Sequence, residues 1–218
     1  KTFVFNLLDD EPMPYNPGQF MLVTVFGAGE APFTLCSMPG DDGLIRMTVR
    51  RYPGGRVTEE LHEMNPGAHV GIRGPVGNGF GLEMMRGRDI LVVAGGIGMA
   101  PQLALLEAIL NDRDQFGELT VFYGMADPEQ MLYNELMAQW QDRDDINLHL
   151  TIDRPHPDWD GHVGLITPLF ENIEVDALMT SATIVGPPVM YRFVIMECEN
   201  LGLNPEYIFL SLERRMSC

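Results

Sequence analysis

The sequence predicts two units in tandem: an antiparallel β-barrel or β-sandwich, followed by an α/β unit built on a parallel sheet. Up to about residue 80, short alternating or apolar runs are separated by turn residues such as NPG and PGDDG, a rhythm typical of antiparallel sheets. After about residue 88, near-continuous apolar runs alternate with helical segments, which is typical of a parallel sheet with helices on both faces. The 218 residues can bury one large core or two smaller ones.

In the first half, the apolar runs predict five strands, interrupted by one short helix. The helix is expected over 58–64, with Thr58 as its N-cap and Asn65-Pro66-Gly67 ending it. Because Lys1 already lies in the apolar run KTFVF, we expect a preceding strand to be missing. The expected strands cover residues 2–7, 19–26, 33–38, 44–51 and 69–74.

In the second half, strands and helices alternate along the chain. The linker between the halves is expected near residues 81–88, which gives domains at 1–85 and 86–212. The strands are expected over 89–94, 119–124, 146–152, 182–186 and 207–212, and the helices over 99–111, 129–141, 165–171 and 189–201.

The overall composition excludes several classes of protein. A net charge of -17 argues against binding nucleic acid, because phosphate backbones are held by cationic surfaces. No apolar run approaches the roughly 18 to 20 residues of a membrane helix, and no basic leader opens the chain, so we expect a cytoplasmic protein without membrane insertion. The three cysteines, Cys36, Cys198 and Cys218, form no close pair, which fits a reduced compartment.

The strongest local motif is VVAGGIGMAP, residues 92–101, where a buried strand leads into a helix. Its glycines remove side chains that would keep a phosphate or a ring from the backbone, and the helix start offers free N–H groups. A plain tight turn is the alternative, because Pro101 stands where the dinucleotide fingerprint G-x-G-x-x-G has its third glycine. A second glycine turn, in ATIVGPPVM at 182–190, follows a strand of the same sheet, and YGMADP at 123–128 follows another. Together they favour a nucleotide at the carboxyl edge.

Arginines cluster in the first half, where Arg46, Arg50, Arg51 and Arg56 fall within eleven residues. With the glycines and the helix start of TVRRYPGGRVTEEL they form a second candidate anion site, because an arginine fork suits phosphate. The first-turn carboxylates of this helix work against such a site, and a solvated strand edge is the alternative. Metal binding and hydrolase chemistry have little support, because the five histidines show no metal-like spacing and no serine lies in a G-x-S-x-G elbow.

Five motifs in order, APFTLCSMP, GGRVTEEL, GPVGNGF, VAGGIGMAP and VGPPVM, resemble the ferredoxin-NADP reductase superfamily. More narrowly, the chain resembles the flavin-binding gamma subunit of cytosolic hydrogenases and sulfhydrogenases and the B subunit of anaerobic sulfite reductase. The electron-transfer subunit of dihydroorotate dehydrogenase B is a near relative. The resemblance implies a Greek-key barrel at 1–85 that binds FAD and an α/β domain at 86–212 that binds NAD(P)H.

The resemblance also implies roles for individual residues. Thr34 would lie near the reactive N5 of the flavin as the catalytic residue, and Phe33 would lie against the flavin ring. The FAD residues would be Pro32, Phe33, Thr34, Val49, Arg50, Arg51, Gly55, Val57 and Thr58. The residues for the nicotinamide nucleotide would be Gly95, Gly96, Ile97, Gly98, Met99, Pro101, Tyr123, Gly124, Gly186, Pro187 and Met190.

Three positions depart from the pattern of the family. Ala31 replaces an arginine that usually meets a flavin phosphate, so Arg50 or Arg51 must compensate, or FAD is held more weakly. Val185 replaces a cysteine that often precedes the Gly-Pro pair. Ala126 lies where many members carry an arginine, which leaves NADH and NADPH both open.

The segment SLERRMSC resembles the run into a [2Fe-2S] segment, so Cys218 would be the first cluster ligand and residues 213–218 the start of that segment. One ligand of four would not hold a cluster in this fragment, and a chance cysteine is the alternative. The resemblance implies hydride transfer between NAD(P)H and FAD, followed by single-electron transfer to the cluster and to a catalytic subunit of hydrogenase or sulfite reductase type. The alternatives are a subunit serving dihydroorotate oxidation and, because of Ala31, a flavin-free docking subunit.

Overall fold

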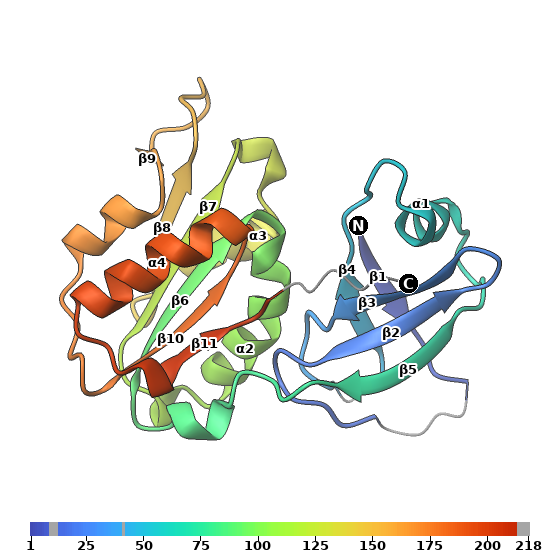
Figure 1. Ribbon diagram of the computed structural model, residues 1–218, viewed down its shortest axis with the longest axis horizontal. Helices are drawn as coiled ribbons and strands as arrows, with labels where there is room; N and C mark the ends of the chain where they lie inside the picture. Colours follow the sequence, from blue (N-terminus) through green and yellow to red (C-terminus); the bar gives the residue numbers. More distant parts are fainter. Residues whose placement is uncertain (9–12, 41, 213–218) are drawn as a thin grey trace.

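Two lobes lie side by side in the computed structural model (Figure 1), which describes residues 1–8, 13–40 and 42–212. The first lobe contains β1 to β5 and helix α1, and the second contains β6 to β11 with helices α2, α3 and α4. The predicted fold class is confirmed: antiparallel sheets in a barrel-like lobe precede a parallel-sheet lobe. No helix within the described ranges is long and apolar enough to cross a membrane.

The first lobe is built from two antiparallel sheets around one core. The first sheet pairs β1 (Thr2–Phe5) with β4 (Ile45–Thr48), and the second has the order β3 (Gly29–Thr34), β2 (Phe20–Val25), β5 (Gly71–Val76). Alternate residues of β2 and β4 point inward, so that Met21, Val23 and Met47 are fully buried. This burial fixes which face of each strand carries the core.

Strand β3 differs from the strand predicted at 33–38, because it begins at Gly29 and ends at Thr34. A tight turn joins β2 to β3: the Ala28 N–H donates to Val25 O at 3.0 Å, and Gly27 has a φ of +86°. The segment GAGEAP, predicted as a break, therefore supplies the turn and the first four residues of a strand. Pro32 fits there because β3 is an edge strand.

Helix α1 (Arg56–Glu63) begins two residues before the predicted start, and its N-cap is Gly55. The prediction that Thr58 is the N-cap was therefore wrong. Gly54, with a φ of +79°, turns the chain early enough for the helix to start at Arg56. The Thr58 hydroxyl instead folds back and donates to Gly55 O at 3.0 Å.

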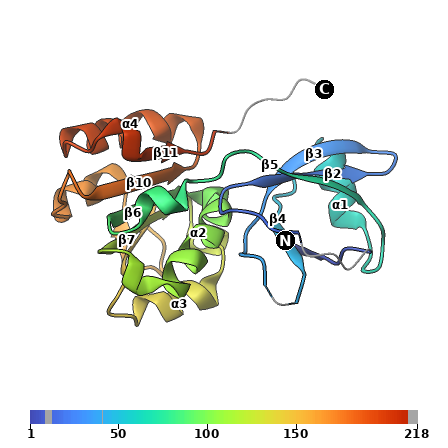
Figure 2. The ribbon, with the colours of Figure 1, turned by 90° about the horizontal axis from the view of Figure 1, so that it is seen from below.

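The second lobe contains a six-stranded parallel sheet with helices on both faces (Figure 2). Helices α2 (Met99–Asn111) and α3 (Asn134–Gln141) cover one face, while α4 (Pro188–Asn200) and the 3-10 turn η5 (Thr167–Asn172) cover the other. The strand order is β11 (Ile208–Leu210), β10 (Thr180–Val185), β6 (Asp89–Gly95), β7 (Leu119–Met125), β8 (Asn147–Ile152), β9 (His162–Val163).

Three details of the second lobe differ from the predictions. The helix predicted over 165–171 is the 3-10 turn η5. The helix predicted over 129–141 starts only at Asn134, because 128–130 form the 3-10 turn η4 and Tyr133 takes a left-handed φ of 57°. The short strand β9 was not predicted, and it arises where His162 pairs with Thr151 at the end of β8. The segment between β5 and β6 contains the 3-10 turn η1 (Leu82–Met85), beside the domain boundary proposed at 85/86.

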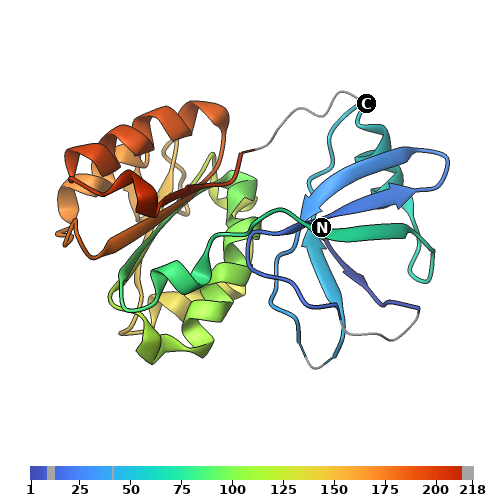
Figure 3. The same ribbon diagram turned by 60° about the horizontal axis from the view of Figure 1, so that its bottom comes forward.

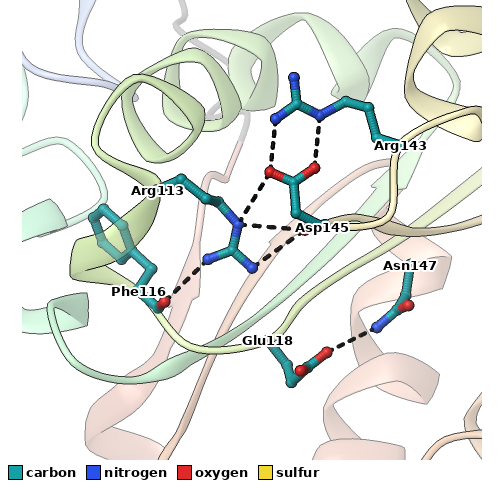
Figure 4. Close-up of polar contacts among 6 residues, drawn as sticks. All are labelled: Arg113, Phe116, Glu118, Arg143, Asp145 and Asn147. Carbon is teal, nitrogen blue, oxygen red and sulfur yellow. Dashed lines mark hydrogen bonds and ion pairs between the residues drawn. The ribbon is translucent and has the colours of Figure 1, made fainter.

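A polar network joins the loops at the amino ends of β7 and β8 (Figure 4). The Arg113 guanidinium donates to Phe116 O at 3.0 Å and to Asp145 O at 3.2 Å, while Arg143 pairs with the Asp145 carboxylate at 2.6 Å. The Arg143 guanidinium lowers the pKa of Asp145 below its usual range. Because parallel strands share one direction, this network lies at the edge of the sheet opposite the glycine turns, and we assign it a structural role.

Candidate flavin and nucleotide site

Three glycines at the carboxyl ends of β6 and β10 allow two turns to pack directly on each other. A Cβ at Gly98 would lie 2.2 Å from Val185 O, and a Cβ at Gly186 would lie 2.9 Å from Met190 Sδ. A Cβ at Gly95 would lie 2.8 Å from the same sulfur. Gly98, which faces Val185 backbone, and Gly95, which also lies 2.8 Å from Pro187 Cδ, are therefore required by the contact between the turns, whether or not a ligand is bound, whereas a Cβ at Gly186 would displace the Met190 side chain of its own turn.

Gly96 differs from these glycines. Its φ is +54°, and a Cβ added to it would meet no protein atom within 4 Å, so space is open above its backbone. Helices α2 and α4 start beside it without side-chain caps. The Met99 N–H donates to Gly96 O, the Met190 N–H donates to Pro187 O, and Pro188 has no N–H, so an anion would meet only the other N–H groups of these turns and the positive ends of the helix dipoles. Backbone open on one side and uncapped helix starts suit the phosphates of a nucleotide.

Other predicted nucleotide residues lie at the same edge but are less accessible. The side chains of Met99 and Tyr123 are fully buried. The Tyr123 hydroxyl accepts a hydrogen bond from Leu132 N–H at 3.1 Å, and burial raises its pKa, so it stays protonated. Gly124 has ordinary 3.4 Å neighbours. Around Gly96 the half-buried or exposed predicted side chains are those of Ile97, Pro101, Pro187 and Met190.

The residues that the resemblance assigns to FAD lie at the end of β3 and between β4 and α1. Pro32 is exposed, Thr34 is half-buried, and Phe33 packs against the core of the first lobe. Val49 is buried, so it can offer only its backbone. Val57 is half-buried at the start of α1, whose first turn also lacks a side-chain cap.

The arginine cluster is divided between internal contacts and one available side chain. Arg46 pairs with Asp42, Arg51 pairs with Glu63 at 2.6 Å, and Arg56 donates to Gly27 O at 3.3 Å. Arg50 is exposed and lies 5.7 Å from the ring centroid of Tyr52, and it makes no ion pair with any described residue.

A hollow of about 550 Å³ lies between the β2–β3 turn and α1. Arg51 and Arg56 line it together with Glu59, Glu60 and Glu63. Its charges are mixed, so the hollow by itself does not favour an anion. Of the two arginines proposed to compensate for Ala31, Arg50 is therefore the better placed.

Cross-lobe hydrogen bonds join the two groups of residues. The Met38 N–H in the first lobe donates to Glu107 Oε2 on α2 at 2.9 Å, and the Thr48 and Tyr133 hydroxyls lie 2.7 Å apart. Figure 3 shows α2 as the helix that faces the first lobe. Sequence reasoning missed these residues. The only signal was Glu107, the single charged residue of α2.

The two cysteines that the structure describes are buried packing residues. Cys36 and Cys198 are free and buried, and burial raises the pKa of Cys198 to about 12, so the thiolate is disfavoured. Across the described ranges no group of three or more His, Cys, Asp or Glu side chains could hold a metal ion. Cys218, the predicted first cluster ligand, lies outside the described residues.

Comparison with known proteins identifies both lobes. Residues 1–80 match the oxidoreductase FAD-binding domain, and residues 92–195 match the oxidoreductase NAD-binding domain. The sulfhydrogenase 2 gamma subunit of Pyrococcus furiosus is 36% identical over 233 residues, covering 100% of this chain and 80% of that protein. The sulfhydrogenase 1 gamma subunit of the same organism is 34% identical over 227 residues, covering 100% and 76%.

Solved structures agree on the fold. A ferredoxin NADP+ reductase from Neisseria gonorrhoeae with bound FAD and NADP superposes with a TM-score of 0.79 at 18% identity, covering 97% of this chain and 92% of that one. The FAD/NAD-binding domain of nitric oxide dioxygenase from Vibrio cholerae gives 0.84 at 19% identity, covering 96% and 90%. With its two domain matches and its full-length likeness to the gamma subunits, the chain belongs to the ferredoxin reductase family of FAD- and NAD-binding oxidoreductases.

Proposed function

We propose that this protein is an electron-transfer flavoprotein subunit that passes hydride between NAD(P)H and FAD, then single electrons to a [2Fe-2S] cluster and a catalytic subunit of hydrogenase or sulfite reductase type. Residues 1–85 would hold FAD and 86–212 the nicotinamide nucleotide. The observation that carries this proposal is the pair of cross-lobe hydrogen bonds. The Met38–Glu107 bond ties the segment after Thr34 to the helix that starts at the glycine turn, and the Thr48–Tyr133 contact ties the end of β4 to the start of α3. The names of the relatives, gamma subunits of sulfhydrogenases, support a partner subunit.

On the FAD side, the proposed roles follow from the chemistry of each group. When bound, FAD exchanges hydride with the nicotinamide and passes electrons on singly. The Thr34 hydroxyl would donate a hydrogen bond at the reactive edge of the ring, and Phe33 would flank the ring. The Arg50 guanidinium and the uncapped first turn of α1 would meet the pyrophosphate. Arg50 fits this role because no described carboxylate neutralises it.

On the nucleotide side, the open backbone at Gly96 and the starts of α2 and α4 would receive the phosphates. Ile97, Pro187 and Met190 would provide apolar contacts for the rings and would exclude water from them. The described residues offer no cluster ligands, so no residue other than Cys218 is proposed for that step.

The test is an anaerobic titration of the purified protein with NADH and, separately, with NADPH while the flavin absorbance is recorded. We expect a yellow protein whose flavin bleaches on addition of at least one of the two coenzymes. A colourless protein that also fails to take up added FAD would contradict the proposal. That result would favour the flavin-free docking subunit. Ala31 supports this alternative, because it stands in place of the arginine that usually meets a flavin phosphate. The subunit that co-purifies with the full-length protein would separate the hydrogenase, sulfite reductase and dihydroorotate alternatives.

A further inference from the structure

The contacts between the lobes join the segments of the first lobe that are proposed to hold the flavin to helix α2 and to the residue before α3 in the second lobe. We propose that Tyr133 and Glu107 are positioning residues, which hold the flavin-edge segment of the first lobe at the geometry needed for hydride transfer from the second. This inference rests on the proposed function, and it adds residues that neither the motifs nor the domain matches assign.

The Tyr133 contact lands between the two segments proposed to hold the flavin. Its hydroxyl lies 2.7 Å from Thr48 Oγ1, and the Thr48 hydroxyl in turn donates to Cys36 Sγ at 3.5 Å. Cys36 follows Thr34 by two residues, and Thr48 immediately precedes Val49. One hydroxyl from the second lobe therefore fixes the ends of both segments at once.

The Glu107 contact lands on the same stretch of the first lobe. Its carboxylate accepts the N–H of Met38 at 2.9 Å, four residues after Thr34. Glu107 stands two turns along α2 from the glycine turn that is proposed to bind the nucleotide. Because a helix is stiff over this length, the contact couples the glycine turn to the flavin-edge segment.

The backbone around Tyr133 is held in place by contacts within the second lobe. Its φ of 57° makes it the only non-glycine residue in the described part of the chain with a positive φ. The preceding Leu132 N–H donates to the hydroxyl of Tyr123, a buried residue of β7. Backbone in this conformation persists only where its surroundings enforce it, and such residues concentrate at functional sites. Burial also raises the pKa of Tyr133, so its hydroxyl remains neutral.

Position matters here because hydride transfer depends steeply on the approach of donor and acceptor. Lobes of this kind move relative to each other unless contacts between them prevent it. A displacement of about 1 Å at the reacting atoms can lower a rate by about 10²-fold. Hydrogen bonds at Tyr133 and Glu107 restrict that displacement without touching either ring.

The test compares Tyr133→Phe with the wild-type protein in anaerobic stopped-flow experiments, with excess NADH or NADPH, whichever bleaches the flavin. We expect the limiting rate of flavin reduction to fall at least about ten-fold, while flavin content and the coenzyme concentration for half-maximal rate stay unchanged. Thr48→Val should give the same loss, and the double variant should lose no more than either single variant. Thr48→Ser, which keeps the hydroxyl, should retain the wild-type rate.

Three further variants separate positioning from folding. Thr2 Oγ1 also lies 2.8 Å from Thr48 Oγ1, so Thr2→Val removes a hydroxyl partner within the first lobe and should leave the rate unchanged. Glu107→Leu should slow reduction, whereas Glu107→Gln, which keeps an acceptor for Met38, should not. Wild-type limiting rates in Tyr133→Phe and Glu107→Leu would overturn the inference, even if their unfolding temperatures fell. A wild-type protein that binds flavin but is bleached by neither coenzyme would refute the proposed function itself, and this inference with it.

Discussion

Adding a single methyl group at Gly98 tests whether the glycine turns interlock as described. In Gly98→Ala the new Cβ would lie 2.2 Å from Val185 O and 3.0 Å from Gly186 N, well inside the 3.4 Å at which ordinary contact begins. Both neighbours are backbone, so the start of α2 and the end of β10 must separate. Overpacking of this kind costs about 1–3 kcal/mol, which lowers the unfolding temperature by about 2–12 °C in a chain of this size.

Scanning calorimetry of the flavin-loaded protein measures the effect, with Gly124→Ala as the matched control. Gly124 lies at the same edge of the sheet, but its nearest neighbours, Ile166 Cδ1 and Thr151 Cγ2, stand at 3.4 Å, so its variant should unfold close to the wild-type temperature. Equal unfolding temperatures for Gly98→Ala and the wild type would refute the close approach of Gly98 to Val185. Because a side chain at Gly98 displaces the turn, lost coenzyme binding in a Gly98 variant reflects both this displacement and the blocking of the site by the new side chain.

Three further predictions concern the first lobe and the polar network. Thr58→Ala should weaken FAD binding by about 1 kcal/mol, because its hydroxyl closes the turn before α1; flavin release measures it, and unchanged affinity would place that turn away from the pyrophosphate. Arg50→Ala should weaken FAD binding more than Arg51→Ala, since Arg51 is already paired with Glu63; the reverse order by the same assay would contradict this role. Asp145→Asn should destabilise the protein at neutral pH and progressively less in acid. A carboxyl whose folded pKa is lowered stabilises the fold above its unfolded pKa and loses that contribution as the pH falls. Urea unfolding at several pH values measures the effect, and a difference in stability that does not change with pH would be inconsistent with it.

The fold could be predicted from the sequence wherever a pattern repeats over several residues. The buried strands of the second lobe are continuous apolar runs, and helix α2 has the predicted bounds of 99–111. The errors in the predicted boundaries occur where the φ angle of a single residue decides where a helix or strand begins. Gly54 and Gly27 take left-handed angles that start α1 and β3 early, and composition does not reveal which glycine in a cluster does so.

For the candidate site, too, some features could be predicted from the sequence and others could not. The glycine turns could be located because each follows a strand along the chain. The cross-lobe contacts could not, because Met38 and Glu107 are 69 residues apart, and Thr48 and Tyr133 are 85 apart. No local pattern encodes such pairs. A lone charge in an apolar helix, as at Glu107, is the one local sign that a distant partner exists.

The interlocking of the turns after β6 and β10 limits where this protein can be redesigned. The turn after β6 cannot accept a larger residue at Gly98 unless the end of β10 moves away, and a Cβ at Gly186 would require the Met190 side chain to shift, so attempts to alter coenzyme preference at Gly98 would disturb the packing of the two turns. The loops after β7 and β8 are not bound in this way: Ala126 is only half-buried and Asp153 is exposed. A library that varies these two loops, with the interlocked glycines left intact, is the practical route to changing the preference between NADH and NADPH.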